Sequence, residues 1–198
     1  MKIPFPILIS GFIGSGKSTL AQKLARTFRA TYVSASHIHQ KIIIEKMKLN
    51  KTKKIEHGFW ETKEGKKGTE LRGKELSIDK EVDKRLLQLL NSKKNIVSDA
   101  RLMPWLYKGK AIRIWLSAPE KTRAKRVGER DGIPARDARM SIRKRMKTDV
   151  GIFTKLYHIR MGEDLTPFDL VMNNEGMAPQ ETYAVVHTYL TRRLSLRK

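Results

Sequence analysis

The first residues that suggest chemistry are Gly11–Ser18, which read GFIGSGKS and match the pattern GxxxxGK[ST] in full. An apolar run typical of a buried strand, Phe5–Ser10, precedes them, and a helical pattern over Lys17–Phe28 follows. In this context the backbone N–H groups of a glycine-rich loop cradle phosphates, and the dipole of the following helix favours negative charge. Lys17 would reach the β- and γ-phosphates as a mobile point charge. The loop therefore predicts binding of a nucleoside triphosphate.

The start of this helix carries two more candidates. The Ser18 hydroxyl is the expected ligand of Mg²⁺, and Thr19 would lie near the α-phosphate. A GTPase would need an NKxD-type motif for base recognition, but the pair Asn173–Asn174 is followed by Glu and Gly. A chain of 198 residues is also short for the oligomeric apparatus of a motor. A small kinase is the better fit.

Arginines are placed where a kinase needs them to clamp phosphates and exclude water. Arg126 and Arg130 are spaced i,i+4 on one predicted helix, so both face one side. Arg143 and Arg145 follow after a break at Gly132–Pro134. Two sets of arginines separated by a turn can hold a transferring phosphoryl group. We expect three other arginines to lie on solvated helix faces instead: Arg123, Arg136 and Arg139.

Four more polar residues are candidates for the same site. Asp99 follows a predicted strand, where the carboxyl edge of a parallel sheet forms a ligand crevice. It could hold Mg²⁺-bound water or an acceptor, or only form a turn. Arg101 could meet an acceptor phosphate with two parallel hydrogen bonds. Asp79 and Asp83 share one helix face, where they either contact a nucleoside or pair with neighbouring lysines.

These residues need a scaffold, and the chain alternates short apolar runs with longer amphipathic segments. This alternation predicts an α/β fold with a five-stranded parallel sheet. The expected strands are Phe5–Ser10, Thr31–Ser34, Asn95–Ser98, Ala111–Leu116 and Phe168–Met172. The expected helices are Lys17–Phe28, Ser36–Met47, Asp79–Leu90, Pro119–Arg130, Asp137–Tyr157 with a break near Gly151, and Pro179–Leu194. The polar stretch Lys51–Ser77 interrupts the pattern and is expected to form loops and a short helix.

The composition excludes several classes of protein. With no cysteine there is no disulfide framework and no thiolate metal site. No apolar run approaches the roughly 18–20 residues of a membrane helix, so we expect a cytoplasmic, monomeric protein without a membrane partner. The chain has 42 Lys and Arg against 20 Asp and Glu, a net charge of +22. This charge favours polyanions, either nucleic acid or phosphate-rich ligands, although scattered lysines on a solvated surface explain it equally well.

Six segments in order carry a resemblance to a known family. They are GFIGSGKSTLAQKLA from Gly11, VSASHI from Val33, SIDKEVDKR from Ser77, IVSDARLMPWL from Ile96, IRIWLSAPEKTRAKRVGERDGI from Ile112 and TPFDLVMNNEGMAPQE from Thr166. Together they resemble the nucleoside monophosphate kinases, and most closely the archaeal-type cytidylate kinases. The resemblance covers most of the chain and is weakest over Gln40–Leu76.

The resemblance implies ATP- and Mg²⁺-dependent transfer of a phosphoryl group to a nucleoside monophosphate, CMP or dCMP. It implies one domain with the three-layer P-loop NTPase fold, in which residues 1–34, 78–130 and 158–198 form the core. Residues 35–77 would then be the insert that binds the monophosphate, and residues 131–157 an arginine-rich lid.

Residue roles follow from the motifs and from the resemblance together. The predicted catalytic residues are Lys17, Arg126, Arg130, Arg143 and Asp99. The predicted cofactor-binding residues are Gly11, Gly14, Ser15, Gly16, Lys17, Ser18, Thr19 and Arg126. The predicted substrate-binding residues are Ser34, Lys41, Asp79, Asp83, Arg101, Arg145 and Asp149. The predicted metal ligands are Ser18 and Asp99.

The chain departs from the family pattern at three positions. His37 and Gln40 stand where an acid and an arginine usually follow the Ser-Ala pair, with Lys41 as a substitute point charge. Ile152 stands where an arginine usually precedes an aromatic residue. Together with the basic stretch Lys46–Lys74, these departures leave two alternatives open. One is an ATP-binding, nucleic-acid- or ribosome-associated P-loop protein with a degenerate acceptor site, and the other is a kinase for another nucleotide or a nucleoside.

Overall fold

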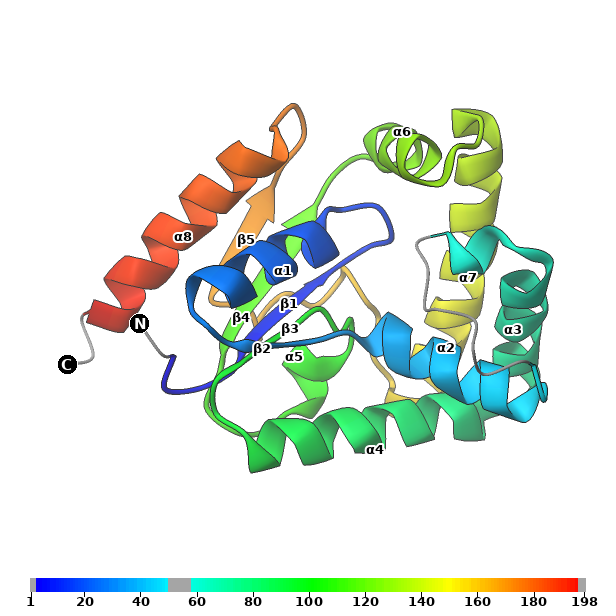
Figure 1. Cartoon of the computed structure of the whole chain (residues 1–198), viewed down its shortest axis with the longest axis horizontal. Helices are drawn as coiled ribbons and strands as arrows, with labels where there is room; N and C mark the ends of the chain where they lie inside the picture. The colour runs from blue at the N-terminus through cyan, green and yellow to red at the C-terminus, as the bar shows by residue number, and fades with distance from the viewer. Residues whose placement is uncertain (1–2, 50–57, 196–198) are drawn as a thin grey trace.

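The computed structural model describes residues 3–49 and 58–195 (Figure 1). Part of the basic stretch Lys46–Lys74 therefore lies outside the described residues. One parallel sheet has the strand order β2-β3-β1-β4-β5. Its strands are β1 (Ile7–Gly11), β2 (Thr31–Val33), β3 (Ile96–Ser98), β4 (Ile112–Ser117) and β5 (Leu170–Asn173). The prediction of an α/β fold with a five-stranded parallel sheet is confirmed.

Helices connect the strands and cover both faces of the sheet. They are α1 (Lys17–Thr27), α2 (Ala35–Lys46), α3 (Lys63–Lys74), α4 (Leu76–Ser92), α5 (Met103–Leu106), α6 (Glu120–Asp131), α7 (Ala135–Tyr157) and α8 (Pro179–Ser195). A short 3₁₀ helix, η1 (Phe59–Glu61), precedes α3. Among the described helices none is both long and apolar enough to cross a membrane.

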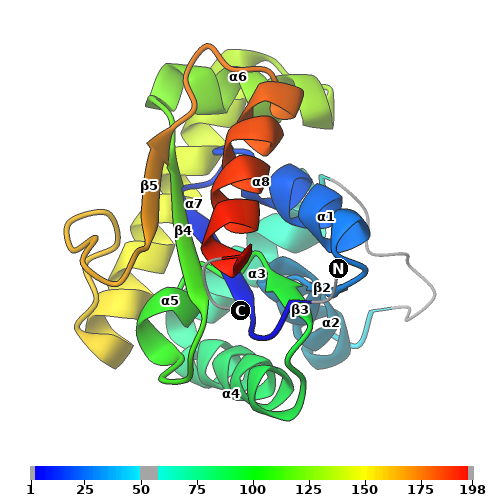
Figure 2. The same ribbon diagram turned by 90° about the vertical axis from the view of Figure 1, so that its left-hand side faces the viewer.

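The central strand shows how the layers are formed. Every residue of β1 is buried, as expected for a parallel strand covered on both faces. Ile7 and Ile9 pack in the core beneath α1 and α8, whereas Leu8 packs in the core beneath α4 and α5. Successive side chains of a strand point to opposite faces, so one apolar run supplies both cores. Figure 2 shows α8 lying beside α1 on one side of the sheet, as their contacts require.

Three elements differ from the sequence prediction. The polar stretch expected to form loops and a short helix contains the twelve-residue helix α3. The short helix α5 was not expected. Helix α7 is continuous through Gly151, where we expected a break. A glycine inside a helix costs only about 1 kcal/mol, and the next residues, Ile152 and Phe153, are buried in the core and hold the helix in place.

The insert and the lid lie together at one end of the sheet, where α2, α3, α6 and α7 gather (Figure 1). Helix α3 packs against both α4 and α7. Polar contacts join the same segments: Glu61 accepts hydrogen bonds from Ser141 and Arg145, and Lys144 pairs with Glu70 at 2.8 Å. The insert and the lid are therefore in direct contact, beyond the carboxyl end of β1.

Candidate active site

One cavity of about 770 Å³ lies between the P-loop, the insert and the helices α6 and α7. We call the part formed by Gly14, Gly16, Lys17, Ser18 and Thr19 the P-loop end. We call the part formed by Ser36, His37, Gln40, Trp60 and Asp83 the insert end. Several other predicted site residues also line the cavity: Ser34, Asp79, Asp99, Arg101, Arg126, Arg130 and Arg145.

The P-loop is shaped by glycine where other chain segments come close. Gly14 has a φ of +82°, and a Cβ there would lie 2.7 Å from the carbonyl oxygen of Arg123. A Cβ on Gly11 would lie 2.2 Å from the carbonyl oxygen of Leu116. Gly11 and the buried Ser15 do not line the cavity, so they support the loop rather than its phosphate-facing side.

Lys17 is the cation of the P-loop end. Its Nζ donates to the carbonyl oxygen of Phe12 at 3.3 Å. Burial, followed by the nearby positive charge of Arg101, lowers the pKa of Lys17 to about 7. Arg145 and Arg130 act in the same direction, while Asp99 opposes them. A lysine held among other cations is a strong site for an anion, because the anion relieves the repulsion.

The residues predicted to hold Mg²⁺ lie side by side. The Ser18 hydroxyl donates to Asp99 Oδ2, and the Tyr32 hydroxyl donates to the same oxygen at 3.0 Å. The other carboxylate oxygen, Asp99 Oδ1, is buried and has no hydrogen-bond partner among the described residues. Hard oxygen donors of this kind suit Mg²⁺, which usually takes one or two protein ligands together with phosphates and water. The residues present therefore fit the ion.

Arginines of α6 contact the loops around the phosphate site. Arg126 donates to the side-chain and main-chain oxygens of Asn174, at 3.0 and 2.8 Å. Asn174 in turn donates to the carbonyl oxygen of Ser15 at 2.9 Å. Arg130 lines the cavity and forms a forked pair with Asp131, at 2.6 and 2.5 Å. Both predicted lid arginines of α6 thus face the cavity.

The prediction that Arg123 lies on a solvated helix face is wrong. It is buried, and its guanidinium donates to the carbonyl oxygens of Ala118 and Ile13, each at 3.0 Å. The same group lies 5.3 Å from the ring centre of Phe12. Arg123 therefore fastens α6 to the P-loop. Arg136 and Arg139 are exposed, as expected.

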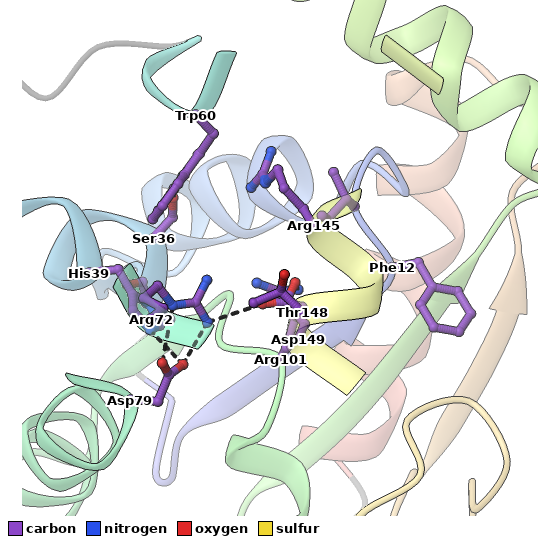
Figure 3. A network of polar contacts seen from close by, with 12 residues as sticks. Phe12, Ser36, His39, Trp60, Arg72, Asp79, Arg101, Arg145, Thr148 and Asp149 are labelled. Carbon is purple, nitrogen blue, oxygen red and sulfur yellow. Dashed lines mark hydrogen bonds and ion pairs between the residues drawn. The ribbon is translucent and has the colours of Figure 1, made fainter. Parts of the chain in front are cut away.

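Arg145 of α7 lines the cavity and contacts the insert. Its guanidinium lies 5.1 Å from the ring centre of Trp60 and donates to Glu61 at 3.3 Å. Burial lowers the pKa of Arg145 to about 10, and Arg101 adds to this effect. Trp60 donates to the Ser36 hydroxyl at 2.7 Å, which fixes the indole at the insert end (Figure 3).

The three predicted carboxylates of the acceptor site are already engaged. Asp79 accepts hydrogen bonds from Arg72, and His39 Nε2 lies 3.0 Å from one of its oxygens. Asp149 is bound by Arg72 and Arg101 and does not line the cavity. Asp83 accepts from the Tyr157 hydroxyl at 2.8 Å, and burial raises the pKa of this carboxyl to about 7.

Two predicted site residues are exposed to solvent and lie away from the cavity in this structure. Arg143 is exposed and pairs with Glu120 at 2.9 Å. It precedes Arg145 by two residues, and two residues turn a helix by about 200°, so the two side chains point in opposite directions. Lys41 is exposed, while its neighbour Gln40 lines the cavity and is buried. The structure therefore supports neither the clamping role predicted for Arg143 nor the substitute charge predicted for Lys41.

The third position that departs from the family pattern is buried. Ile152 is 2% exposed and packs in the core beneath α4, so it presents no group to the cavity. His37 and Gln40 do line it. Gln40 Oε1 is buried and has no hydrogen-bond partner among the described residues, which makes it a free acceptor at the insert end.

Sequence reasoning missed several residues of the site: Tyr32, His39, Trp60, Arg72 and Asn174. Arg72 had one signal, since it is the single arginine in the lysine-rich stretch 46–74. An arginine among lysines marks a position where a planar, bidentate donor is needed. His39 and Asn174 act through partners that are far away in the sequence, so no local spacing points to them.

The parallel sheet, the P-loop at its carboxyl edge and the arginines of two helices around one cavity define a P-loop kinase. Residues 6–176 match the model of the cytidylate kinase-like family, and the chain belongs to that family. It is thus a nucleoside monophosphate kinase, as predicted.

Curated relatives agree with this placement. The chain is 32% identical to a cytidylate kinase of Sulfurisphaera tokodaii, over 93% of this chain and 94% of that protein. It is 34% identical to a cytidylate kinase of Saccharolobus islandicus, over 93% of this chain and 90% of that protein. Among solved structures, a gluconokinase from Sinorhizobium meliloti has a TM-score of 0.56 at 14% identity, over 98% of this chain and 96% of that one. A shikimate kinase from Acinetobacter baumannii has a TM-score of 0.51 at 17% identity, over 96% and 94%. These two structures share the fold.

Proposed function

We propose that the enzyme transfers the γ-phosphoryl group of ATP to CMP or dCMP in the presence of Mg²⁺. The observation that carries this proposal is the cluster of cations around one cavity. Arg101, Arg145 and Arg130 all depress the pKa of Lys17. So much positive charge in a buried place is unfavourable until polyanions arrive, and a reaction that joins two phosphate-bearing substrates supplies them.

The donor binds at the P-loop end. Backbone N–H groups of the loop and the Lys17 ammonium hold the β- and γ-phosphates. Ser18 and Asp99 would hold Mg²⁺, which would supply positive charge to neutralise the charge that develops on the phosphates. Hydrogen bonds from Arg126 to Asn174 and from Asn174 to the P-loop hold the loop after β5 in place, so this side of the donor site is fixed.

The acceptor binds with its phosphate toward Arg101 and Arg145. An oxygen of that phosphate attacks the γ-phosphorus in line, and the bond to the oxygen that bridges the β- and γ-phosphates breaks, which leaves ADP. The protein contributes positioning and charge stabilisation to this step rather than covalent chemistry. Arg126 and Arg130 from α6 line the same cavity, which supports a contact with the transferring group.

The insert end carries the support for a cytosine base. Gln40 Oε1 is a buried acceptor without a partner among the described residues, and it lines the cavity. An exocyclic amino group, which cytosine has and uracil lacks, can satisfy it. The cytidylate kinases among the curated relatives agree with this acceptor.

The test is a panel of nucleoside monophosphates with ATP and Mg²⁺, followed through ADP formation. We expect CMP and dCMP to give the highest kcat/KM, and UMP to be weaker because it leaves Gln40 Oε1 unpaired. A control without acceptor reports hydrolysis of ATP alone. Equal, background-level ADP formation with every monophosphate contradicts the proposal.

A second candidate function is association with nucleic acid. The net charge of +22 and the exposed lysines of α3, Lys63, Lys66 and Lys67, favour it. A salt titration of RNA binding tests this candidate, since phosphate contacts give a steep dependence on salt. RNA binding that is already weak at physiological salt contradicts it.

A further inference from the structure

Arg72 is a buried cation that plays no part in the proposed chemistry. Its side chain is 3% exposed, comes from the insert helix α3 and does not line the cavity. Its Nε and Nη2 donate to the two oxygens of Asp79 at 3.1 and 2.5 Å, and Nη2 also donates to Asp149 Oδ1 at 3.0 Å. Burial opposes its charge, but these two carboxylates hold the pKa of Arg72 above its usual value.

Asp149 uses its two oxygens for two different arginines. Oδ1 accepts from Arg72, while Oδ2 accepts from Arg101 Nη1. The Asp149 side chain is 1% exposed, so water cannot take the place of either partner. Both arginines lower the pKa of this carboxyl despite its burial, and it stays ionised.

The contacts form a chain of four alternating charges. It runs from Asp79 of α4 through Arg72 of α3 and Asp149 of α7 to Arg101 in the loop after β3 (Figure 3). Only Arg101, at one end, and Asp79, at the other, reach the cavity. The two carboxylates balance the two guanidiniums. The position of Arg101 in the cavity therefore depends on Asp149, and the position of Asp149 depends on Arg72.

We propose that Arg72 is a positioning residue for the acceptor phosphate: by holding Asp149 Oδ1 it keeps Oδ2 where it fixes the Arg101 guanidinium toward the cavity. The inference rests on the proposed function of this cavity. Without Arg72, Asp149 has a free oxygen in a dry place and draws Arg101 into a two-pronged pair. Such a pair points the Arg101 donors at the protein and away from the acceptor.

The test compares Arg72→Met and Arg72→Lys with Lys74→Met, an exposed control on the same helix. With Arg72→Met we expect the KM of the acceptor to rise about 10²-fold, because a displacement of about 1 Å has effects of that size. We expect the dissociation constant of the donor to stay within about twofold. Arg72→Lys keeps the charge but not the planar fork, and we expect a rise of about tenfold. Lys74→Met should match the wild type.

A double-mutant cycle with Arg101→Met separates positioning from mere stability. If Arg72 acts through Arg101, then Arg72→Met has little further effect on acceptor KM once Arg101 is gone. Additive effects, or a fall in kcat with unchanged KM, overturn the positioning role. Donor binding and thermal unfolding confirm that each variant is folded. If Arg72→Met does not fold, Arg72→Lys replaces it in the double-mutant cycle. A wild-type enzyme inactive with every monophosphate overturns the proposed function and this inference together, whereas an active wild type with additive variants overturns this inference alone.

Discussion

The two ends of the cavity are built in different ways. The P-loop end comes from one continuous segment, in which β1, the glycine-rich loop and α1 follow each other in the sequence. Its ligand-facing groups are backbone N–H groups and the side chains that begin α1. The insert end is assembled from α2, η1 and α4, which are separate elements of the sequence. Ion pairs and hydrogen bonds between side chains hold it together.

Because of this difference, the two ends are sensitive to different substitutions. Only a substitution by proline removes a backbone donor, so at the P-loop end the side chains are open to the most direct testing. At the insert end Ser36, Trp60 and Asp83 are each held by another side chain, so a change of one of them also affects its partner. We therefore expect substitutions at the P-loop end to act on the donor and on turnover, and those at the insert end to act on the acceptor.

The largest effect is expected at the P-loop end. Lys17→Met removes the cation that we propose holds the β- and γ-phosphates, and we expect kcat to fall by about 10³-fold. The exposed Arg26→Met, on the same helix, is the matched control and should keep full activity. Steady-state kinetics and thermal unfolding of both variants provide the measurement. Normal turnover by a folded Lys17→Met protein contradicts the assignment of the loop.

The next effect separates the acceptor from the donor. Arg101→Met removes a guanidinium that we propose binds the acceptor phosphate, and we expect about a 10²-fold loss in kcat/KM for the acceptor. The donor should bind within about twofold of the wild type in a calorimetric titration. Arg136→Met, an exposed arginine of α7, is the control. An equal loss of donor and acceptor binding would remove the distinction between the two ends.

The pH dependence of donor binding sharpens the comparison. Lys17 has a pKa near 7 in the free enzyme, so above this pH it is increasingly neutral. Phosphates bind the protonated form, and binding therefore takes up a proton. We expect the donor affinity to fall as pH rises above 7, approaching tenfold per unit. Calorimetry in two buffers of different ionisation enthalpy measures the proton, and no uptake at pH 8 contradicts the prediction.

The smallest effect concerns stability at the insert end. Burial raises the pKa of Asp83 to about 7, from an ordinary value of 3.8. The folded protein thus holds a proton that the unfolded chain releases between pH 4 and 7, and the contribution of Asp83 to stability falls as pH rises through this window. We expect Asp83→Asn to raise the free energy of unfolding by about 1–2 kcal/mol at pH 8, and much less at pH 4.

Urea unfolding at the two pH values measures this difference, with the exposed Asp137→Asn as the control. The asparagine oxygen can still accept the hydrogen bond of Tyr157, so that contact is kept. If Asp83→Asn destabilises the protein equally at both pH values, then Asp83 is ionised in the folded state.

The contrast between the two ends also decides what the sequence reveals. Lys17, Ser18 and the sheet could be predicted because the loop motif and the apolar periodicity are local patterns. Arg126 and Arg130 could be placed at the cavity from their helical spacing. Arg143 was grouped with Arg145 by proximity along the chain, and in this structure it is exposed and lies away from the cavity. A helix separates neighbours by 100°, and only Arg145 of that pair faces the cavity.

The insert end was harder to predict because its groups meet only in the folded protein. Asp79 and Asp149 were predicted as site residues, but their partner Arg72 lies in the stretch of weakest resemblance.

Arg123 was expected to be solvated because its carbonyl partners, on Ile13 and Ala118, carry no sequence signal. Every residue has a backbone carbonyl, so no sequence pattern can predict such a contact.

The direct contact between insert and lid has a consequence for engineering. Glu61, Glu70 and Arg72 from the insert each have a partner on α7. A chimera that exchanges the insert alone would remove one of the two arginines that hold the buried Asp149, and one that exchanges α7 alone would remove one of the two carboxylates that hold the buried Arg72. Removing one partner of a buried ion pair costs about 3–5 kcal/mol. The two segments must therefore be transplanted as one module to change the acceptor preference of this scaffold.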